Sequence, residues 1–254
     1  MKIVATIEAR MGSSRLPGKS MKKIVGKPML ELLFERVKNS KLINEIVVAT
    51  TQNPNNDVIE ELAKKMSIGC FRGSENDVLD RVLNAAKSVS ADVILELWGD
   101  NPLIDPKMLD NLIKFYSEND FDCVGTALPN FKKTYPIGIS TLIFSTKILE
   151  EVNSITNDPE DRENVSNYIY EHPEKYKISS LPCPPELDYP DLRLTVDEEN
   201  DFNLVKTIFE NLYSINPMFD TYDIINFIKL NPQLKNLNKN VMQKKLKKWD
   251  KFTA

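Results

Sequence analysis

The first half of the chain alternates short apolar runs with longer amphipathic stretches, and this alternation restricts the possible folds more than any other feature. The apolar runs are almost continuous, which is typical of strands covered on both faces. Strand and helix in alternation predict an α/β fold in three layers, with a mostly parallel, right-handed sheet between helices. The expected strands cover 2–7, 45–50, the region around Cys70 and 92–97, and the expected helices cover 28–38, 57–65, 77–88 and 106–116.

Between residues 121 and 181 the alternation loosens. Shorter strands and helices are expected there, and the stretch from Pro129 to Gly138 is expected to form a loop over the site. The expected strands cover 122–126 and 140–144, and the expected helices cover 146–152, 160–170 and, further along, 202–213.

The loop after the first expected strand concentrates cations, glycines and hydroxyl groups. Its members are Arg10, Gly12, Ser13, Ser14, Arg15, Gly18 and Lys19. Glycine lets the backbone approach a ligand, hydroxyls and amides donate hydrogen bonds, and Arg and Lys complement phosphate oxygens. The loop is therefore predicted to hold a polyphosphate. The glycines are six residues apart, which excludes a P-loop, and a solvated basic loop without a ligand is the alternative interpretation.

Further polar residues follow other expected strands. Thr50 ends the second strand, and Asp100 follows the strand that ends near Trp98. Because ligands of parallel sheets bind at the carboxyl ends of the strands, these residues and the basic loop are expected to lie at one edge of the sheet.

Two aspartates are candidates for binding a metal ion. Asp100 and Asp197 each follow a strand-like apolar run. One or two carboxylates, together with phosphate oxygens and waters, are typical ligands of Mg²⁺, so Mg²⁺ or Mn²⁺ is the expected cofactor. The alternative for Asp100 is a turn or a helix cap, and the acids that follow Asp197 are able to cap the helix expected at 202–213.

Composition excludes several classes of protein. The net charge of −4 argues against binding to a nucleic-acid backbone, which requires a basic surface. Three widely spaced cysteines indicate neither a disulfide framework nor a zinc site. No apolar run approaches the length of a membrane span, and the N-terminus runs directly into a strand, so a cytoplasmic protein is expected.

Four ordered motifs carry a resemblance to a known family. They are Ala9 to Lys19 with its continuation at 25–30, then 73–81 (GSENDVLDR), 99–105 (GDNPLID) and 193–197 (RLTVD). This series resembles the cytidylyltransferases that activate bacterial surface sugars, and among them the spore coat polysaccharide nucleotidyltransferases are closer than the enzymes of acidic ketosugars. The resemblance is expected to fade after about Leu230.

The resemblance implies a Rossmann-like fold of the nucleotide-diphospho-sugar transferase type. It implies a nucleotidyltransferase domain over 1–230, within which about 121–182 binds the acceptor and forms a homodimer. Residues 231–254 carry seven lysines and one acid and are expected to form a basic helical tail. The tail is expected to pack on its own domain, with a membrane surface or another protein as alternatives. Its possible helix anchors are Leu237, Val241, Leu246, Trp249 and Phe252.

The resemblance also implies roles for particular residues. The catalytic residues would be Arg15, Lys19, Asp100 and Asp197, and the last two would bind the metal. The nucleotide-binding residues would be Ala9, Arg10, Gly12, Ser13, Ser14, Arg15, Lys19, Thr50, Asn76, Asp77, Val78 and Arg81. For the last four, a plain helix capped by Ser74 or Asp77, with Val78 in the core, is the simpler interpretation.

The expected reaction is transfer of a nucleoside monophosphate from a nucleoside triphosphate, CTP favoured, to a sugar or sugar-phosphate acceptor with release of pyrophosphate. GTP with a sugar 1-phosphate, a glycosyltransferase and a non-catalytic nucleotide-binding protein are the alternatives. The chain departs from the family pattern at 135–138 and at Asn164, where relatives often have Pro-Asp-Gly and His. Acceptor identity therefore stays open.

Overall fold

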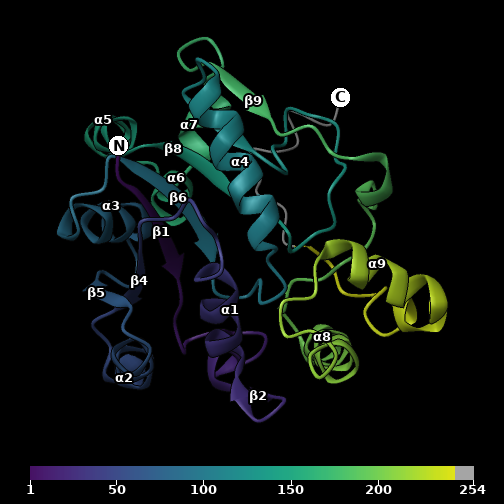
Figure 1. The fold of residues 1–254 in the computed structure, drawn as a ribbon. Coiled ribbons are helices and arrows are strands. Elements are labelled where there is room, and N and C mark those ends of the chain that lie inside the picture. Colours follow the sequence, from purple (N-terminus) through teal and green to yellow (C-terminus); the bar gives the residue numbers. More distant parts are fainter. Residues whose placement is uncertain (244–254) are drawn as a thin grey trace.

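A computed structural model describes residues 1–243 and shows a seven-stranded sheet with helices on both sides (Figure 1). The strands follow the order β5-β4-β1-β6-β8-β7-β9 across the sheet, and β2 pairs with β3 in a separate hairpin. Their bounds are β1 Ile3–Glu8, β2 Lys23–Ile24, β3 Lys27–Pro28, β4 Glu45–Thr51, β5 Gly69–Gly73, β6 Val93–Trp98, β7 Cys123–Gly125, β8 Leu142–Ser145 and β9 Ile178–Ser180.

The sheet is mostly parallel, as the sequence predicts. Strands β5, β4, β1 and β6 run in the same direction, with Thr6 opposite Val47 on one side and Glu96 on the other. Strand β8 is antiparallel to both β6 and β7, and β9 pairs in parallel with β7. The carboxyl ends of β1, β4 and β6 therefore meet at one edge, where the basic loop, Thr50 and Asp100 were expected to lie.

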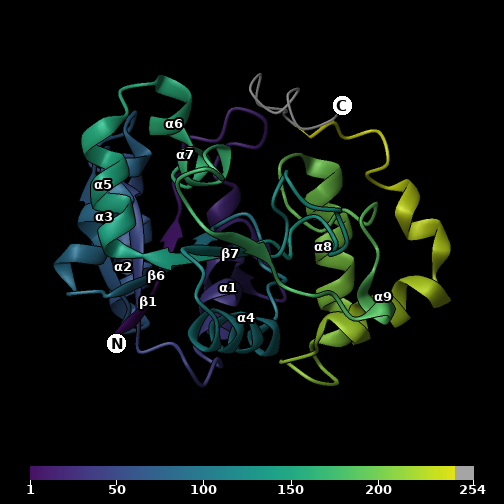
Figure 2. The same ribbon diagram turned by 90° about the horizontal axis from the view of Figure 1, so that it is seen from above.

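Helices cover both faces of this sheet (Figure 2). Helices α3 and α5 pack on one face, whereas α1, α2 and α4 pack on the other. Within residues 1–243, none of the helices is long and apolar enough to cross a lipid bilayer. The bounds are α1 Met29–Val37, α2 Asp57–Lys65, α3 Val78–Ser88, α4 Pro106–Glu118, α5 Thr146–Ile155, α6 Pro159–Glu163, α7 Asn167–Glu171, α8 Glu199–Leu212 and α9 Thr221–Leu230, with 3-10 helices η1 Lys19–Met21, η2 Pro54–Asn56, η3 Pro185–Leu187 and η4 Pro232–Asn236.

The prediction of one helix over 160–170 is wrong. The chain forms α6 and α7 instead, because Asn164 leaves the helical conformation at φ −123° and ψ 90°. Its side-chain Nδ2 donates a hydrogen bond to the carbonyl of Glu160, four residues back. An Asn side chain that satisfies the helix carbonyl in this way favours termination.

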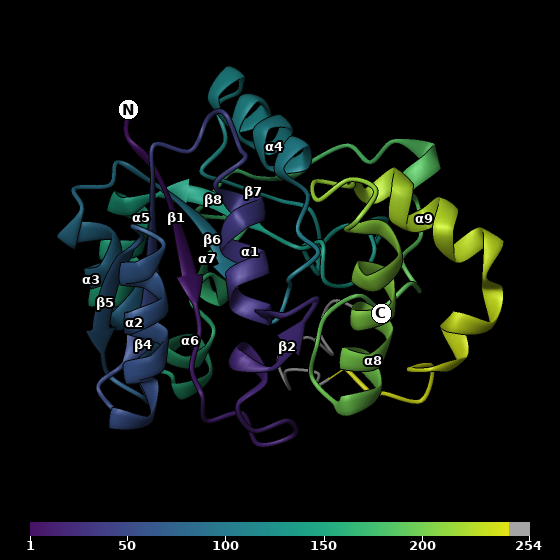
Figure 3. The same cartoon turned by 60° about the horizontal axis from the view of Figure 1, so that its bottom comes forward.

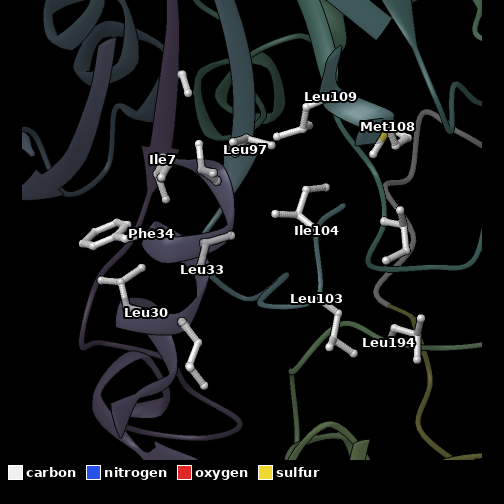
Figure 4. Packing of buried hydrophobic residues seen from close by; sticks show 14 of the residues in the cluster. Ile7, Leu30, Leu33, Phe34, Leu97, Leu103, Ile104, Met108, Leu109 and Leu194 are labelled. Carbon is white, nitrogen blue, oxygen red and sulfur yellow. The ribbon is translucent and has the colours of Figure 1, made fainter. Parts of the chain in front are cut away.

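Apolar side chains between the sheet and α1 fix the strand ends (Figure 4). Ile7 and Leu97 project from β1 and β6, and Leu33 and Phe34 project from α1 towards them; all four are at most 1% exposed. Burial of such a side chain contributes roughly 1.5–3 kcal/mol. The loops that follow β1 and β6 therefore start from rigid positions.

Helix α8 lies beside the β2–β3 hairpin and α9 packs against α8 (Figure 3), and both helices share a hydrophobic core with α1. A buried arginine connects these parts: Arg36 Nε donates to the carbonyl of Ile104 at 2.7 Å, and Nη2 donates to the carbonyl of Phe219 at 2.7 Å. Burial lowers the pKa of Arg36 to about 10, so its charge persists at neutral pH. This arginine therefore connects α1 to the segment before α4 and to the turn between α8 and α9.

The chain beyond α9 belongs to the expected basic tail. Its described part, 231–243, contains η4, after which the chain continues without an α-helix as far as residue 243. Leu237 is 40% exposed. The other expected anchors Leu246, Trp249 and Phe252 lie outside the described residues, so the helical tail stays a prediction there.

Candidate active site

A cleft of about 490 Å³ opens at the carboxyl ends of β1 and β6. The basic loop lines one end, and residues of α3, β8 and the 127–138 loop line the other. Most residues predicted for the site lie on its wall. These are Ala9, Arg10, Ser13, Ser14, Arg15, Lys19, Val78, Arg81, Asp100 and Asp197.

Lys19 connects the two candidate metal-binding residues. Its Nζ lies 3.0 Å from Asp100 Oδ2 and 3.4 Å from Asp197 Oδ1, and it donates to the carbonyl of Val196 at 2.7 Å. The Lys19 side chain is 12% exposed. One ammonium group thus faces three oxygen atoms that converge on the same point.

Asp197 is surrounded by further cations. Arg15 Nη2 is 2.9 Å and Arg193 Nη2 is 2.7 Å from Asp197 Oδ2. Burial opposes ionisation of Asp197, but Lys19, Arg193 and Arg15 outweigh it and hold the pKa of this carboxyl below its usual value. Asp197 is therefore ionised throughout the neutral range.

The two aspartates fit a hard divalent cation. Both offer carboxylate oxygens, which hard cations prefer as ligands, and the ammonium group of Lys19 lies between them. Within residues 1–243, no cluster of three or more His, Cys, Asp or Glu side chains forms a complete metal site. Two protein carboxylates with substrate phosphate oxygens would make up the ligand set.

The acids that follow Asp197 cap helix α8, which is the role that the sequence analysis gave as an alternative for them. Glu198 and Asp201 form a capping box at the start of α8, and Asp201 is fully buried. Asp201 Oδ2 accepts hydrogen bonds from the backbone N–H groups of Asp197 and Glu198 at 3.0 and 3.1 Å.

The motif at 73–81 connects to the basic loop through Glu75. Glu75 Oε1 lies 3.4 Å from Arg10 Nη1, and Oε2 accepts a hydrogen bond from Thr51 at 3.1 Å. Arg81 is 2% exposed and donates to the carbonyl of Ser74. The motif therefore forms one wall of the cleft beside the end of β4.

Four predicted nucleotide-binding residues do not line the cleft, and their roles stay predictions. Thr50 is fully buried, Gly12 is exposed, and Asn76 lies in the turn before α3. Asp77 caps α3 by accepting from the N–H of Asp80 at 3.0 Å, and it forms an ion pair with Arg162.

The sequence interpretation missed two acids that line the cleft, the half-buried Glu8 and the buried Glu96. Burial, and then its neighbour Glu96, raise the pKa of Glu8 well above its usual value. Burial raises the pKa of Glu96 to about 7. An acid between apolar residues of a strand, as in Leu95-Glu96-Leu97, is costly to bury and marks a functional position.

Other polar atoms in the same part of the cleft lack a hydrogen-bond partner within the described protein. They are Arg81 Nε and Asn101 Oδ1. Glu8 and Glu96 are hydrogen-bonded to each other, which requires one of the two carboxyls to hold a proton. Unpaired buried atoms are costly, so a ligand or water with both donors and acceptors fits here. Beside them, Trp98, Leu128, Leu142 and Tyr170 add apolar surface.

The predicted loop over the site carries a glycine that no other residue can easily replace. Gly138 has φ +97°, and a Cβ on it would lie 2.3 Å from the backbone nitrogen of Thr195. Ile137 forms a parallel bridge with Arg193. The loop therefore packs backbone against backbone on the segment that leads to Asp197.

This fold and this site define a nucleotidyltransferase. The model of the cytidylyltransferase family matches residues 4–246, so the chain belongs to the cytidylyltransferase family. The match extends beyond Leu230, where the sequence interpretation expected the resemblance to end.

Three individual proteins are similar to this chain along most of its length. The spore coat polysaccharide biosynthesis protein SpsF of Bacillus subtilis is 30% identical over 91% of this chain and 95% of its own length. An uncharacterised protein of Methanocaldococcus jannaschii is 40% identical over 96% of this chain and 97% of its length. The structure of a cytidylyltransferase from Leptospira borgpetersenii superposes with a TM-score of 0.86 at 35% identity, covering 96% of this chain and all of that one.

Proposed function

We propose that this protein transfers CMP from CTP to a sugar or sugar-phosphate acceptor and releases pyrophosphate. The observation that carries the proposal is that Lys19 contacts Asp100 and Asp197, and Arg15 contacts Asp197, in a cleft whose wall also includes Arg10. A triphosphate needs the cations, and the metal that accompanies it needs the carboxylates. Membership of the cytidylyltransferase family supports CTP as the nucleotide.

In this reaction an acceptor oxygen forms a bond to the α-phosphorus of CTP. The bond from that phosphorus to the bridging oxygen breaks, and pyrophosphate leaves with the electron pair. Transfer of this kind depends on positioning and charge neutralisation. Arg15 and Lys19 would hold the triphosphate and stabilise the charge that develops on pyrophosphate, and Arg10 would hold it from the Glu75 side.

A divalent cation, Mg²⁺ or Mn²⁺, would be held by Asp100 and Asp197. When bound, it would supply positive charge to the reacting phosphate oxygens. Lys19 lies between the two carboxylates in this structure, so it would turn towards the phosphates as the cation arrives.

The other end of the cleft suits a sugar. Glu8 and Glu96 offer acceptor oxygens, Arg81 offers a donor, and Trp98 and Tyr170 offer flat apolar surface. Sugar hydroxyl groups both donate and accept hydrogen bonds, so they would satisfy these atoms together. The similarity to a spore coat polysaccharide protein supports a role in surface polysaccharide or other glycan biosynthesis.

Two further features of the proposal come from the family resemblance: a homodimer formed through residues 121–182, and a cytoplasmic location. Light scattering on the purified protein measures the first, and cell fractionation measures the second.

A pyrophosphate-release screen tests the function. The four common nucleoside triphosphates are each combined with sugar 1-phosphates and with acidic ketosugars, in the presence of Mg²⁺. The expected result is release that requires CTP and one acceptor class. No release with any pair would contradict the proposal, and release with GTP alone would replace CTP by the alternative nucleotide.

A further inference from the structure

The segment that follows η4 returns to the phosphate end of the cleft. Figure 2 shows this yellow part of the chain running back from η4 towards the loop after β1. Met242 accepts a hydrogen bond on its carbonyl from Arg15 Nη1 at 3.3 Å, and Gln243 lines the cleft. A stretch that the sequence assigns to a tail thus lies beside the triphosphate-binding loop.

Asn238 fixes this segment to the protein. Its side chain is 5% exposed, and Nδ2 donates to the carbonyl of Arg193 at 3.0 Å and to Asp201 Oδ1 at 2.9 Å. A buried amide with two such partners is a strong anchor, since its loss would leave acceptors unpaired. The neighbouring Lys239 and Asn240 are exposed, so the anchoring is specific to one position.

Arg193 links the segment to the proposed metal site. Its guanidinium is buried and donates to Asp201 Oδ1 at 2.9 Å and to Asp197 Oδ2 at 2.7 Å. Its remaining nitrogen, Nη1, donates to the side-chain oxygen of Gln243. Three sides of one guanidinium are therefore occupied by Asp201, Asp197 and the C-terminal segment.

This arrangement determines which oxygen of Asp197 is available. Arg193 and Arg15 both contact Oδ2, so Oδ1 is the oxygen turned towards Lys19 and Asp100. A carboxylate ligand binds a metal well when its neighbours hold it in one orientation, and loss of such a neighbour typically lowers metal affinity ten- to a hundredfold. Residues that fix the position of Arg193 therefore influence the affinity of Asp197 for a metal ion.

We propose that residues 238–243 are part of the active site, with Asn238 and Gln243 as positioning residues that hold Arg193 and, through it, Asp197. The proposal rests on the function above, because it takes Asp197 as a metal ligand. The segment also ties down Arg15 through the carbonyl of Met242, so it acts on the triphosphate loop and the metal carboxylate together.

Binding of Mn²⁺ with CTP tests the proposal without turnover. The full-length protein and the variants Asn238→Ala and Gln243→Met are titrated with Mn²⁺ and CTP in the absence of acceptor, with calorimetry for the nucleotide and the electron paramagnetic resonance signal of free Mn²⁺ for the metal. The expected result is a Kd for Mn²⁺ about tenfold higher in each variant. Lys239→Ala, exposed and in the same segment, is expected to match the wild type.

The variants separate positioning from folding. Gln243 is exposed, so Gln243→Met keeps the side-chain length and removes the acceptor for Arg193 without loss of core packing. In turnover, a positioning role predicts a higher Mg²⁺ concentration for half-maximal rate, whereas a merely structural role would lower kcat at all Mg²⁺ concentrations.

The outcomes of this experiment are distinct. Wild-type protein that fails to bind Mn²⁺ with CTP would overturn the proposed function, and this inference with it. Wild-type binding together with unchanged Mn²⁺ affinity in Gln243→Met would overturn this inference and leave the function standing.

Discussion

Lys19 Nζ lies 3.0 Å from Asp100 Oδ2, in the position that a metal ion bound by Asp100 and Asp197 would approach. The ammonium group also donates a hydrogen bond to the carbonyl of Val196 at 2.7 Å, so it contacts three oxygen atoms. Lys19 thus balances the charge of the two acids that we propose as metal ligands. Phosphate oxygens would have to draw Lys19 away before a metal binds tightly.

The first prediction concerns metal binding in the absence of nucleotide. Lys19→Met is expected to bind Mn²⁺ about tenfold or more tightly than the wild type, because a charge-assisted hydrogen bond of about 1.5–3 kcal/mol no longer competes for the carboxylates. The electron paramagnetic resonance signal of free Mn²⁺ measures this affinity. Lys22→Met, which removes an ion pair with Glu199 outside the cleft, serves as the control. Equal affinities in Lys19→Met and the wild type would show that Lys19 does not occupy the metal position.

The second prediction concerns the two aspartates themselves. Asp100→Asn and Asp197→Asn keep the side-chain volume and remove the charge, so each is expected to lower Mg²⁺-dependent pyrophosphate release about a hundredfold or more. Both would serve one metal, so the double variant is expected to be little worse than the poorer single variant. Losses that multiply would assign the two residues to separate roles, and a single variant with full activity would remove that residue from the site.

The third prediction concerns pH and stability. Glu96 has its pKa raised by burial from 4.5 to about 7 in the folded protein. Its folded-state pKa exceeds the unfolded value, so its contribution is fully present at low pH and is lost as pH rises through about 7. The melting temperature of the wild type is therefore expected to fall between about pH 5 and pH 7 relative to Glu96→Gln.

The exposed Glu118→Gln is the matched control for that experiment and is expected to follow the wild type. Parallel curves for the wild type and Glu96→Gln would contradict a raised pKa at Glu96.

The fourth prediction concerns Gly138. Gly138→Ala is expected to destabilise the protein by more than the roughly 1–2 kcal/mol of a left-handed residue, because the new Cβ would also meet the backbone of Thr195 at 2.3 Å. Gly26→Ala is the matched control, since Gly26 has a similar φ of +82° with no atom within 4 Å of the added Cβ. Urea unfolding measures both. Equal losses in the free energy of unfolding would show that the backbone near Thr195 accommodates the added Cβ without further destabilisation.

The sequence predicts the parallel half of the sheet well because local patterns decide it. The short apolar runs at 2–7 and 92–97 form strands β1 and β6 as predicted, and parallel pairing places their carboxyl ends at one edge. The antiparallel strand β8 and the break at Asn164 depend on longer-range pairing and on one side-chain hydrogen bond. A strand is expected at 140–144, but the alternation of apolar residues encodes neither its antiparallel direction nor the break at Asn164.

The candidate site also has a part that the sequence predicts and a part that only the tertiary structure reveals. Residue type and position along the chain were enough to predict that the basic loop, Asp100 and Asp197 form one site. The strand expected before Asp197 is wrong, because that segment forms only an isolated bridge at Arg193. Tertiary structure alone decided that Lys19 bridges Asp100 and Asp197, that Glu8 and Glu96 are hydrogen-bonded to each other, and that Asn238 reaches Arg193. Each of these relations joins residues far apart in the chain, and folding brings them within hydrogen-bonding distance through packing that no local pattern records.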